Sequence, residues 1–381
     1  MPLLRVREFS ATGYRSLRKI TCPVSELEVF VGGNGVGKTN LYRALELVRA
    51  AATNSLGLEL AQEGMEAAFW AGRRGSGSPR IELEVRLSDP QARGAARGAY
   101  RYHVSVGFPQ PTAAAFAAEP QIKEEWLSYD GGGRQVRLVD RRGPSVMVRD
   151  EAGRPVEIDI DLLASETVLG RLEDPSRFPM LDMVRRTLLE WRFYHDLRTD
   201  AGSPMRRPCP AVATPTLASD GANLAAVFAT LAHIRQDTHD LDAVIGAAFP
   251  GAQLIVPRPE RAATFGMVFS EFPQRVFEPD ELSDGTLRFL GLAGALLAYR
   301  LPPFIALNEP EASLHPDLMV PLARLVTQAA ERSQVWLVTH SQPLADAIAA
   351  TGSGKVRTVT KREGATWIEG LNLLGAFADE D

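Results

Sequence analysis

The segment VFVGGNGVGKTN, at residues 29–40, contains a glycine-rich loop between two apolar runs. The apolar run before the loop, at residues 27–31, is typical of a buried strand. The apolar spacing after it, at residues 41–48, is typical of a helix that continues to about Ala52. The loop fits the phosphate-binding pattern G-x-x-x-x-G-K-[ST] through Gly32, Gly37, Lys38 and Thr39. A strand, this loop and a helix in this order predict a site for a nucleoside triphosphate.

The residues of the loop have distinct expected roles. Glycines allow backbone N–H groups to turn toward phosphate oxygens, and the helix N-terminus adds the positive end of its dipole. We expect Lys38 to reach the β- and γ-phosphates and Thr39 to place its hydroxyl on Mg²⁺. The flanking strand and helix favour this site over a glycine-rich turn without a ligand. The expected phosphate-binding residues are Gly32, Gly33, Asn34, Gly35, Val36, Gly37, Lys38, Thr39 and Asn40.

Composition is that of a globular protein. The chain has 381 residues, of which 45% are hydrophobic and 23% charged, which suits one large domain with insertions or two domains. A formal net charge of −5 means that any nucleic-acid surface must be local. Two distant cysteines, Cys22 and Cys209, argue against a disulfide framework or a zinc site. The N-terminus lacks a signal-peptide pattern and the longest apolar stretch, 289–299, is too short for a bilayer, so we expect a cytoplasmic protein without a membrane partner.

The rest of the chain changes from strand-like to helix-like patterns. Short runs of strand character between glycine and proline clusters predict an antiparallel sheet from residues 81–87, 100–106, 122–129, 135–140 and 145–148. Apolar residues at helical spacing predict helices within residues 160–172, 181–191, 223–235 and 237–248. We therefore expect a discontinuous domain with an N-terminal lobe at 1–158, a helical insertion at 159–250 and a C-terminal lobe at 251–381.

A second group of polar residues follows in the C-terminal part. The sequence LSDGT, at 282–286, precedes a strongly apolar helix at 287–301, and buried-strand runs at 303–307 and 335–339 end in NEPE and in His340. An acidic residue that follows a strand beside a phosphate loop can help to bind Mg²⁺ and to position the attacking water. A nearby histidine could contact the γ-phosphate. A Ser-Asp-Gly segment alone is typical of a capped helix. The order and spacing of all these pieces favour a nucleotide site.

These motifs resemble the RecF/SMC-type branch of ABC ATPases, and within it the small RecF-like predicted ATPases related to the ATPase part of the overcoming-lysogenization-defect (OLD) family. Residues 32–40 resemble Walker A, and LSDGT resembles a divergent signature motif in place of LSGGQ. Asn308 and Glu309 are similar to the end of Walker B with its catalytic glutamate, residues 313–315 to the D-loop, and His340 to the switch histidine. Residues 9–17 resemble the start of the family's fold.

The resemblance implies an α/β fold, an ABC-type P-loop NTPase head with a mixed central sheet and flanking helices, an antiparallel β subdomain and an inserted helical lobe. It implies hydrolysis of ATP with Mg²⁺, with Glu309, His340 and Lys38 as catalytic residues and with Thr39 and Asn308 at the metal. It also implies a homodimer that sandwiches ATP. The signature residues of one head then contact the nucleotide of the other through Ser283, Asp284 and Gly285.

The implied setting is DNA repair and maintenance or defence against foreign DNA. DNA and a separate effector or nuclease protein are the expected partners, because little sequence follows His340. Two other functions stay open. One is a nucleotide-binding regulatory module with little hydrolysis, and the other is a transport-type ABC ATPase subunit. The divergent signature and the large insertion argue against the transport function.

Three features depart from the family pattern. Asn308 stands where Walker B usually has aspartate; an amide oxygen still accepts from a metal-bound water but brings no charge, so slow turnover is expected. The alternative is an asparagine that only closes a strand. Gln62 is the candidate for the glutamine loop, with a solvated helix residue as the alternative. Residues 40–282 lack a long heptad run, so we expect a compact lobe and not a long coiled-coil arm.

Two basic clusters are candidates for a nucleic-acid surface. Residues 185–207 combine arginines with Trp191, Phe193 and Tyr194, and such a combination can hold phosphates and stack on bases. The alternative is that the aromatic rings face the core while the arginines are solvated or ion-paired. The second cluster lies in the predicted sheet, where a solvated face is the alternative, and comprises Arg134, Arg137, Arg141, Arg142 and Arg149.

Overall fold

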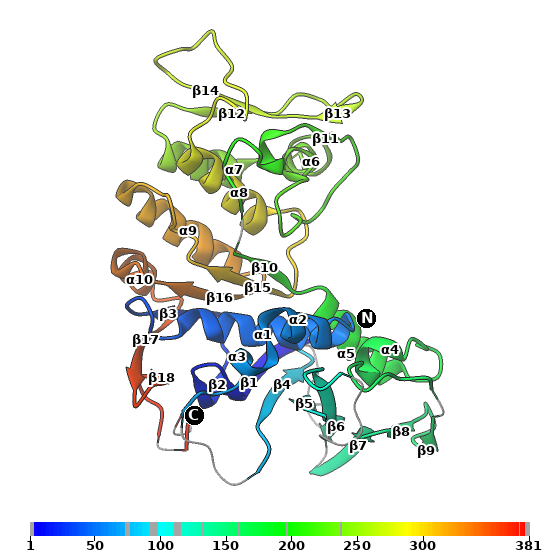
Figure 1. Ribbon diagram of the computed structural model, residues 1–381. Helices are drawn as coiled ribbons and strands as arrows, with labels where there is room; N and C mark the ends of the chain where they lie inside the picture. The colour runs from blue at the N-terminus through cyan, green and yellow to red at the C-terminus, as the bar shows by residue number, and fades with distance from the viewer. Residues whose placement is uncertain are drawn as a thin grey trace. The chain divides into compact units, whose positions relative to one another are not determined.

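The computed structural model describes residues 4–72, 77–90, 98–109, 116–131, 133–158, 160–195, 197–236, 238–372 and 374–377 (Figure 1). The chain forms two compact units. Unit 1 comprises residues 1–25, 32–191 and 357–381, and unit 2 comprises residues 26–31 and 192–356. The boundaries predicted for three lobes do not coincide with these units, and that division stays a prediction.

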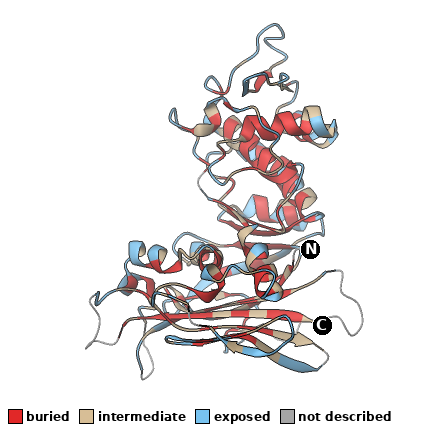
Figure 2. Ribbon diagram, turned by 90° about the vertical axis from the view of Figure 1, so that its right-hand side faces the viewer, coloured by how far each residue is buried: buried red, intermediate tan, exposed pale blue. Residues whose placement is uncertain are grey.

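Unit 1 contains an eight-stranded antiparallel sheet in the order β2-β1-β4-β5-β6-β7-β8-β9. The antiparallel sheet predicted for residues 81–148 is confirmed. Along β4, Ile81, Leu83, Val85 and Leu87 are buried and the residues between them are not, as expected for a sheet with one covered face (Figure 2). The strands are β1 (Arg5–Tyr14), β2 (Leu17–Pro23), β4 (Arg80–Ser88), β5 (Ala99–Gly107), β6 (Gln121–Gly131), β7 (Arg134–Arg142), β8 (Ser145–Arg149) and β9 (Pro155–Glu157).

Helix α1 (Lys38–Ala52) packs on strands β1 and β4 of this sheet. Its buried face includes Leu41, Leu45 and Val48, so the helix predicted to follow the glycine-rich loop is confirmed to its last residue. The other helices of unit 1 are α2 (Leu56–Glu63), α3 (Met65–Ala68), α4 (Val168–Arg171) and α5 (Pro179–Leu189). Near the C-terminus, β17 (Lys355–Arg362) pairs with β18 (Ala365–Ile368) as a hairpin.

A buried polar network replaces most of the helix predicted within residues 160–172. The Arg141 guanidinium donates to the carbonyl oxygens of Leu163 and Glu166, which a helix would have used for its own N–H groups. Glu125 accepts from the N–H groups of Val168 and Leu169, at 2.7 and 2.9 Å, where the one short helix α4 begins. Burial raises the pKa of the Glu125 carboxyl and lowers the pKa of the Arg141 guanidinium. Long-range hydrogen bonds therefore override the local helical spacing.

Unit 2 contains four parallel strands in the order β10-β15-β16-β3. They are β10 (Arg192–Tyr194), β15 (Phe304–Asn308), β16 (Gln334–Thr339) and β3 (Leu27–Val31). The strands β3 and β16 are buried along their whole length, as expected for parallel strands covered on both faces. The buried-strand runs predicted at 303–307 and 335–339 are confirmed.

The helices of unit 2 are α6 (Leu224–Thr230), α7 (His239–Ala248), α8 (Asp284–Leu297), α9 (Met319–Ala330) and α10 (Gln342–Ala349). Shorter elements are the helical turns η2 (Pro204–Arg206), η3 (Leu231–Arg235) and η4 (Pro316–Leu318) and the strand pairs β11 (Cys209–Pro210) with β13 (Ala262–Ala263) and β12 (Gln253–Ile255) with β14 (Gly266–Val268). Helix α8 is almost wholly apolar and packs against α6, α7 and α9. Within the described part of the chain, no helix has the length and apolar character needed to cross a bilayer.

Candidate functional site

The glycine-rich loop ends in a backbone conformation that requires glycine. Gly37 caps α1 with φ of 95°, in the left-handed region. A Cβ atom at this position would lie 1.9 Å from Thr366 Oγ1 and 2.3 Å from Ser16 Oγ. Both the dihedral angle and the space exclude a side chain, so the second glycine of the phosphate-loop pattern has a structural cause.

The back of the loop is held by hydroxyl and amide groups from distant parts of unit 1. Asn40 Nδ2 donates to Ser16 Oγ at 2.6 Å, and Ser16 Oγ lies 2.6 Å from Thr366 Oγ1. Thr366 Oγ1 in turn donates to the Val36 carbonyl oxygen at 2.9 Å. In the structure Asn40 ties the loop to the β1–β2 turn, and its contact with phosphate stays a prediction. Nothing in the local sequence around Thr366 indicates its part in the loop.

The front of the loop carries the expected phosphate-binding groups. The Lys38 side chain is 4% exposed, and its Nζ donates to the carbonyl oxygens of Gly32 and Gly33 at 2.7 and 2.8 Å. This places the ammonium group over the loop that is predicted to cradle the phosphates. Thr39 follows at the first turn of α1 and is exposed, as are the loop residues Gly33, Asn34 and Gly35.

In unit 2, parallel pairing brings Glu309 and His340 together at the ends of neighbouring strands. Asn308 pairs with Val338, and the Glu309 N–H donates to the Val338 carbonyl oxygen at 2.8 Å. His340 Nδ1 lies 3.8 Å from Glu309 Oε1. Glu309 has φ of 49°, a conformation that side chains rarely adopt and that often marks a functional position. Both side chains are partly exposed, so they remain accessible to a ligand.

Glu311 is a site residue that the sequence analysis did not single out. Its side chain is 4% exposed, and its Oε1 accepts from the Thr339 hydroxyl at 2.5 Å and from the N–H groups of His340 and Ser341 at 3.0 and 3.2 Å. The same oxygen lies 3.2 Å from His340 Nδ1. Glu311 therefore fixes the backbone and the ring of His340. Glu311 is the second glutamate of the NEPE segment, and this acidic residue beside Glu309 was the only sign of it in the sequence. The sequence did not show that its side chain is buried.

Asn308 offers an acceptor for a hydrated metal ion. Its Oδ1 is buried and has no hydrogen-bond partner among the described residues, and the same is true of Glu311 Oε2. Oxygen atoms of this kind suit Mg²⁺ and its water molecules. The described residues contain no group of three or more His, Cys, Asp or Glu side chains that would hold a metal by themselves. These residues therefore fit an Mg²⁺ ion that arrives with phosphates.

The LSDGT segment forms the N-terminus of α8. Ser283 Oγ accepts from the Thr286 N–H at 3.1 Å, so Ser283 is the helix cap and α8 begins at Asp284, earlier than the apolar run suggested. A Cβ at Gly285 would lie 2.9 Å from the Ser313 carbonyl oxygen, which places the segment against the D-loop-like turn. From the next turn of α8, Arg288 donates to the Glu309 carbonyl oxygen at 3.3 Å. The signature helix and the Glu309 backbone are thus directly linked.

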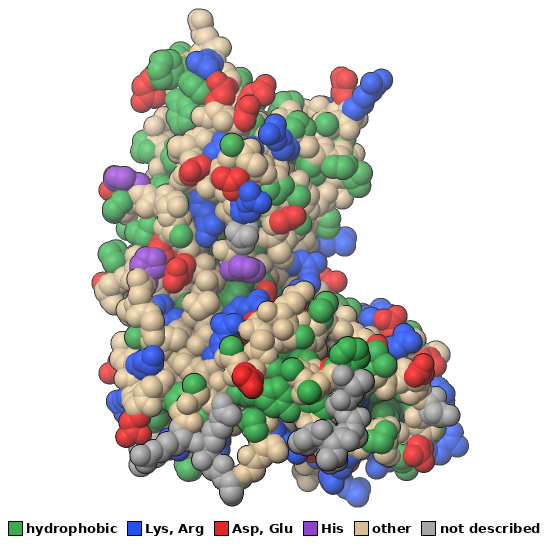
Figure 3. Space-filling model, viewed as in Figure 1, with side chains coloured by type: hydrophobic (Ala, Val, Ile, Leu, Met, Phe, Trp, Pro, Cys, Tyr) green, Lys and Arg blue, Asp and Glu red, His purple; other side chains and the backbone are tan. Residues whose placement is uncertain are grey.

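In the first basic cluster, at residues 185–207, the aromatic side chains are buried and arginines form ion pairs. Trp191, Phe193 and Tyr194 are buried, which confirms the alternative that these aromatic rings face the core. Arg186 and Arg198 form ion pairs with Asp182 and Asp200, at 2.7 and 2.9 Å. On the face shown in Figure 3, basic and acidic side chains are interspersed.

The arginines of the second basic cluster, in strands β7 and β8, lie in different environments. Arg141 is buried and lies beside Glu125, so at this position neither a nucleic-acid contact nor the solvated alternative holds. Arg137 lies over the Trp126 ring, 4.2 Å from its centroid. Arg134 and Arg142 are exposed.

Gln62, the candidate for the glutamine loop, is exposed on α2, as the solvated alternative predicts.

Replacing Glu311 with alanine tests its structural part. Glu311→Ala removes the acceptor of the Thr339 hydroxyl and of the His340 N–H, whereas the Ser341 N–H keeps Thr339 Oγ1 as an acceptor at 2.9 Å. We expect the free energy of unfolding to fall by about 3 kcal/mol. Urea unfolding of the full chain, followed by tryptophan fluorescence, measures the change. Glu309→Ala is the matched control, because the Glu309 carboxylate is more exposed. Equal stability of the two variants would contradict the assignment.

Comparison with known proteins agrees with the fold. Residues 159–346 match the family described as "AAA domain, putative AbiEii toxin, Type IV TA system". No curated protein sequence matches the chain. A solved SmcHead bound to the C-winged helix domain of ScpA is similar, with a TM-score of 0.56 and 14% identity over 97% of this chain and 98% of that one. The Smc head domain of Pyrococcus furiosus, with an extended coiled coil and bound to the C-terminal domain of ScpA, has a TM-score of 0.54 and 14% identity over 97% of both chains. The protein therefore has the α/β fold of an SMC head domain, which confirms the predicted fold class.

Proposed function

We propose that this protein binds and hydrolyses ATP. The observation that carries the proposal is the loop at residues 32–40, where a glycine-specific turn, a lysine ammonium group and the start of α1 converge. Such a turn binds phosphate through backbone N–H groups and the helix dipole. The SMC-head fold and the family match at residues 159–346 support the same proposal.

In the proposed reaction, each polar group has a task. Lys38 neutralises charge on the β- and γ-phosphates, and Thr39 and Asn308 hold Mg²⁺ or its water. The metal ion, when bound, offsets the charge that develops on the transferred phosphoryl group. Glu309 orients and deprotonates the attacking water, and His340, held by Glu311, contacts the γ-phosphate.

We further propose that two copies of the chain sandwich ATP. Ser283, Asp284 and Gly285 lie at the first turn of α8, where free N–H groups and the dipole favour an anion. In the proposed homodimer this end of α8 caps the γ-phosphate bound to the partner. ATP then favours the dimer and hydrolysis releases it, because the ligand binds the two states with different affinity.

The proposed setting is DNA repair and maintenance or defence against foreign DNA, as in the RecF-like and OLD-related proteins that the motifs resemble. The toxin named in the description of the matching family favours defence. DNA and a separate effector or nuclease protein are the proposed partners. The two similar Smc heads were each solved with a domain of ScpA, which supports a protein partner for this fold.

A second candidate is a nucleotide-binding regulatory module with little hydrolysis. The observation in its favour is Asn308, which brings an uncharged oxygen to the position where a carboxylate usually helps to hold Mg²⁺. Such a module would bind ATP and change state without measurable turnover.

Nucleotide binding is tested first at Lys38. Lys38→Ala removes a charged donor from the loop, and we expect the Kd for ATP to rise by about tenfold to a hundredfold. Isothermal titration calorimetry of the full chain measures it. Lys19→Ala, on the exposed surface of β2, is the control with the same change of charge. Unchanged affinity in Lys38→Ala would show that the loop does not bind the phosphates.

Hydrolysis is tested at Glu309. Glu309→Gln keeps the shape of the side chain but cannot take a proton, so we expect turnover to fall by at least about a hundredfold while ATP still binds and the dimer accumulates. Steady-state phosphate release and analytical ultracentrifugation with and without ATP measure both effects. Glu331→Gln, an exposed residue after α9, is the control. A wild type that binds ATP without turnover favours the regulatory module.

The charge missing at Asn308 is tested by restoring it. Asn308→Asp places a carboxylate at the end of β15, and we expect half-maximal activity at a lower Mg²⁺ concentration and a faster turnover. A magnesium titration of the ATPase rate measures the shift. Asn372→Asp makes the same chemical change at an exposed turn and serves as the control. An unaltered magnesium dependence would mean that position 308 only closes the strand.

A further inference from the structure

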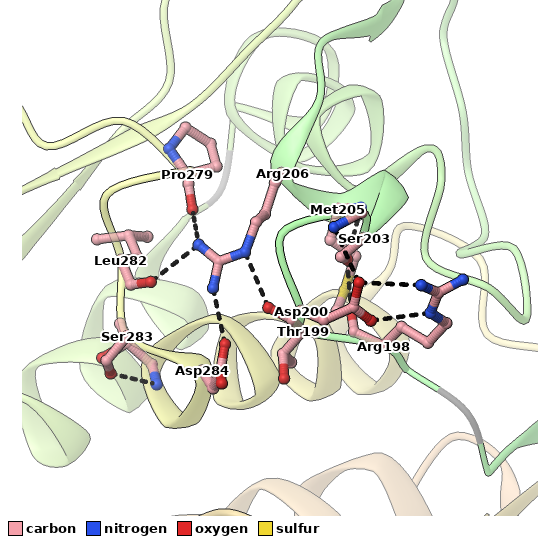
Figure 4. A network of polar contacts seen from close by, with 12 residues as sticks. Arg198, Thr199, Asp200, Ser203, Met205, Arg206, Pro279, Leu282, Ser283 and Asp284 are labelled. Carbon is pink, nitrogen blue, oxygen red and sulfur yellow. Dashed lines mark hydrogen bonds and ion pairs between the residues drawn. The ribbon is translucent and has the colours of Figure 1, made fainter.

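Arg206, in the turn η2, binds the segment that leads into α8 (Figure 4). Its side chain is 8% exposed, although the residue belongs to the cluster first considered for nucleic acid. Nη1 donates to the carbonyl oxygens of Pro279 and Leu282 at 2.7 and 2.9 Å, and Nη2 donates to Asp284 Oδ1 at 2.8 Å. Nε donates to the Thr199 carbonyl oxygen at 2.8 Å. A single planar guanidinium thus joins four acceptors.

Asp284 places a negative charge at the N-terminus of α8, where the proposed dimer would place a phosphate. It is the first residue of α8, directly after the cap Ser283, and its side chain is 61% exposed. A carboxylate stabilises a helix N-terminus, but an unpaired one also occupies the positive end of the dipole and repels a second anion. At a helix end that is to receive a phosphate, the charge of Asp284 must therefore be offset and directed away. Its partner in the structure is Arg206.

The loop that presents Arg206 is itself held by local hydrogen bonds. Ser203 Oγ accepts from the Met205 N–H at 3.2 Å and donates to the Arg198 carbonyl oxygen. Asp200 accepts from the Gly202 N–H at 2.8 Å and pairs with Arg198. The guanidinium is therefore presented by a turn that has its own support, as Figure 4 shows.

We infer that Arg206 is the positioning residue of the LSDGT segment, and that it makes this helix end able to receive the γ-phosphate bound to a second copy of the chain. It neutralises Asp284, and through Pro279 and Leu282 it fixes the backbone on the N-terminal side of Ser283. The guanidinium suits this task better than an ammonium group, because its planar fork serves several acceptors at once. The inference rests on the proposed ATP-sandwiched dimer.

The experiment compares wild type, Arg206→Met, Asp284→Asn and the double variant as full chains. For each we would measure the Kd for ATP, the ATP-dependent dimerisation constant by analytical ultracentrifugation, and kcat and KM for ATP. In Arg206→Met we expect dimerisation to weaken by about tenfold or more and kcat to fall with it, because Asp284 is left unpaired. The Kd for ATP should stay within about twofold of wild type, because the phosphate loop is untouched.

The double variant separates charge from general structure. In the double variant, the logarithm of the dimerisation constant should recover at least half of what Arg206→Met lost, because the charge of Asp284 is gone. If the role of Arg206 were purely structural, the double variant would show no such recovery. Circular dichroism checks that each variant is folded. Arg206→Gln with and without Asp284→Asn makes the same comparison if the methionine variant does not fold, because glutamine also lacks the charge.

Each outcome has one meaning. Loss in Arg206→Met with rescue by Asp284→Asn supports the inference. If wild type dimerises with ATP and Arg206→Met equals it, or if the folded double variant shows no rescue, the inference fails and the dimer stands. If wild type binds ATP but does not dimerise, the proposed dimer fails and the inference fails with it.

Discussion

Parallel pairing of β15, β16 and β3 is the constraint on which the candidate site depends. Parallel strands run in one direction, so the residues that follow their carboxyl ends collect at one edge of the sheet. Leu307 pairs with Leu337, and Leu337 pairs with Val29, which keeps the three strand ends nearly level. Glu309 and His340 meet at this edge. These two residues of unit 2 are distant in the sequence and come together because the register of the pairing sets which strand ends lie side by side.

The two carboxylates after β15 show how environment assigns different tasks to the same chemical group. Glu309 is partly exposed, in a left-handed backbone conformation, and is free to face a ligand. Glu311, two residues later, is buried and accepts from three donors of the β16–α10 turn. The first carboxylate is accessible to a ligand, and the second holds the backbone and the ring of His340 in place. The amide of Asn308 adds an oxygen without a charge, so the site keeps acceptors while it carries less negative charge than three carboxylates would bring.

Sequence patterns predicted the features whose causes are local. The strand, loop and helix around Lys38, the alternating strands of the antiparallel sheet and the cap at Ser283 each follow from residues within a few positions of one another. The features that were missed depend on contacts between distant segments. Arg141 donates to carbonyl oxygens that a helix at 160–172 would have used, and Arg206, which belonged to the candidate nucleic-acid cluster, is a buried partner of Asp284. The position of such a guanidinium depends on the tertiary fold, so local sequence propensities do not predict it.

The hydrogen bond from Thr366 to the Val36 carbonyl oxygen has a consequence for how the protein is made. Chains leave the ribosome from the N-terminus, and early segments fold before late ones exist. Thr366 emerges 330 residues after Val36, because that distance separates them in the sequence. During synthesis the loop therefore lacks this support until the β17–β18 hairpin has emerged. The final conformation of the loop would then arise only after the segment at 355–368 has been translated.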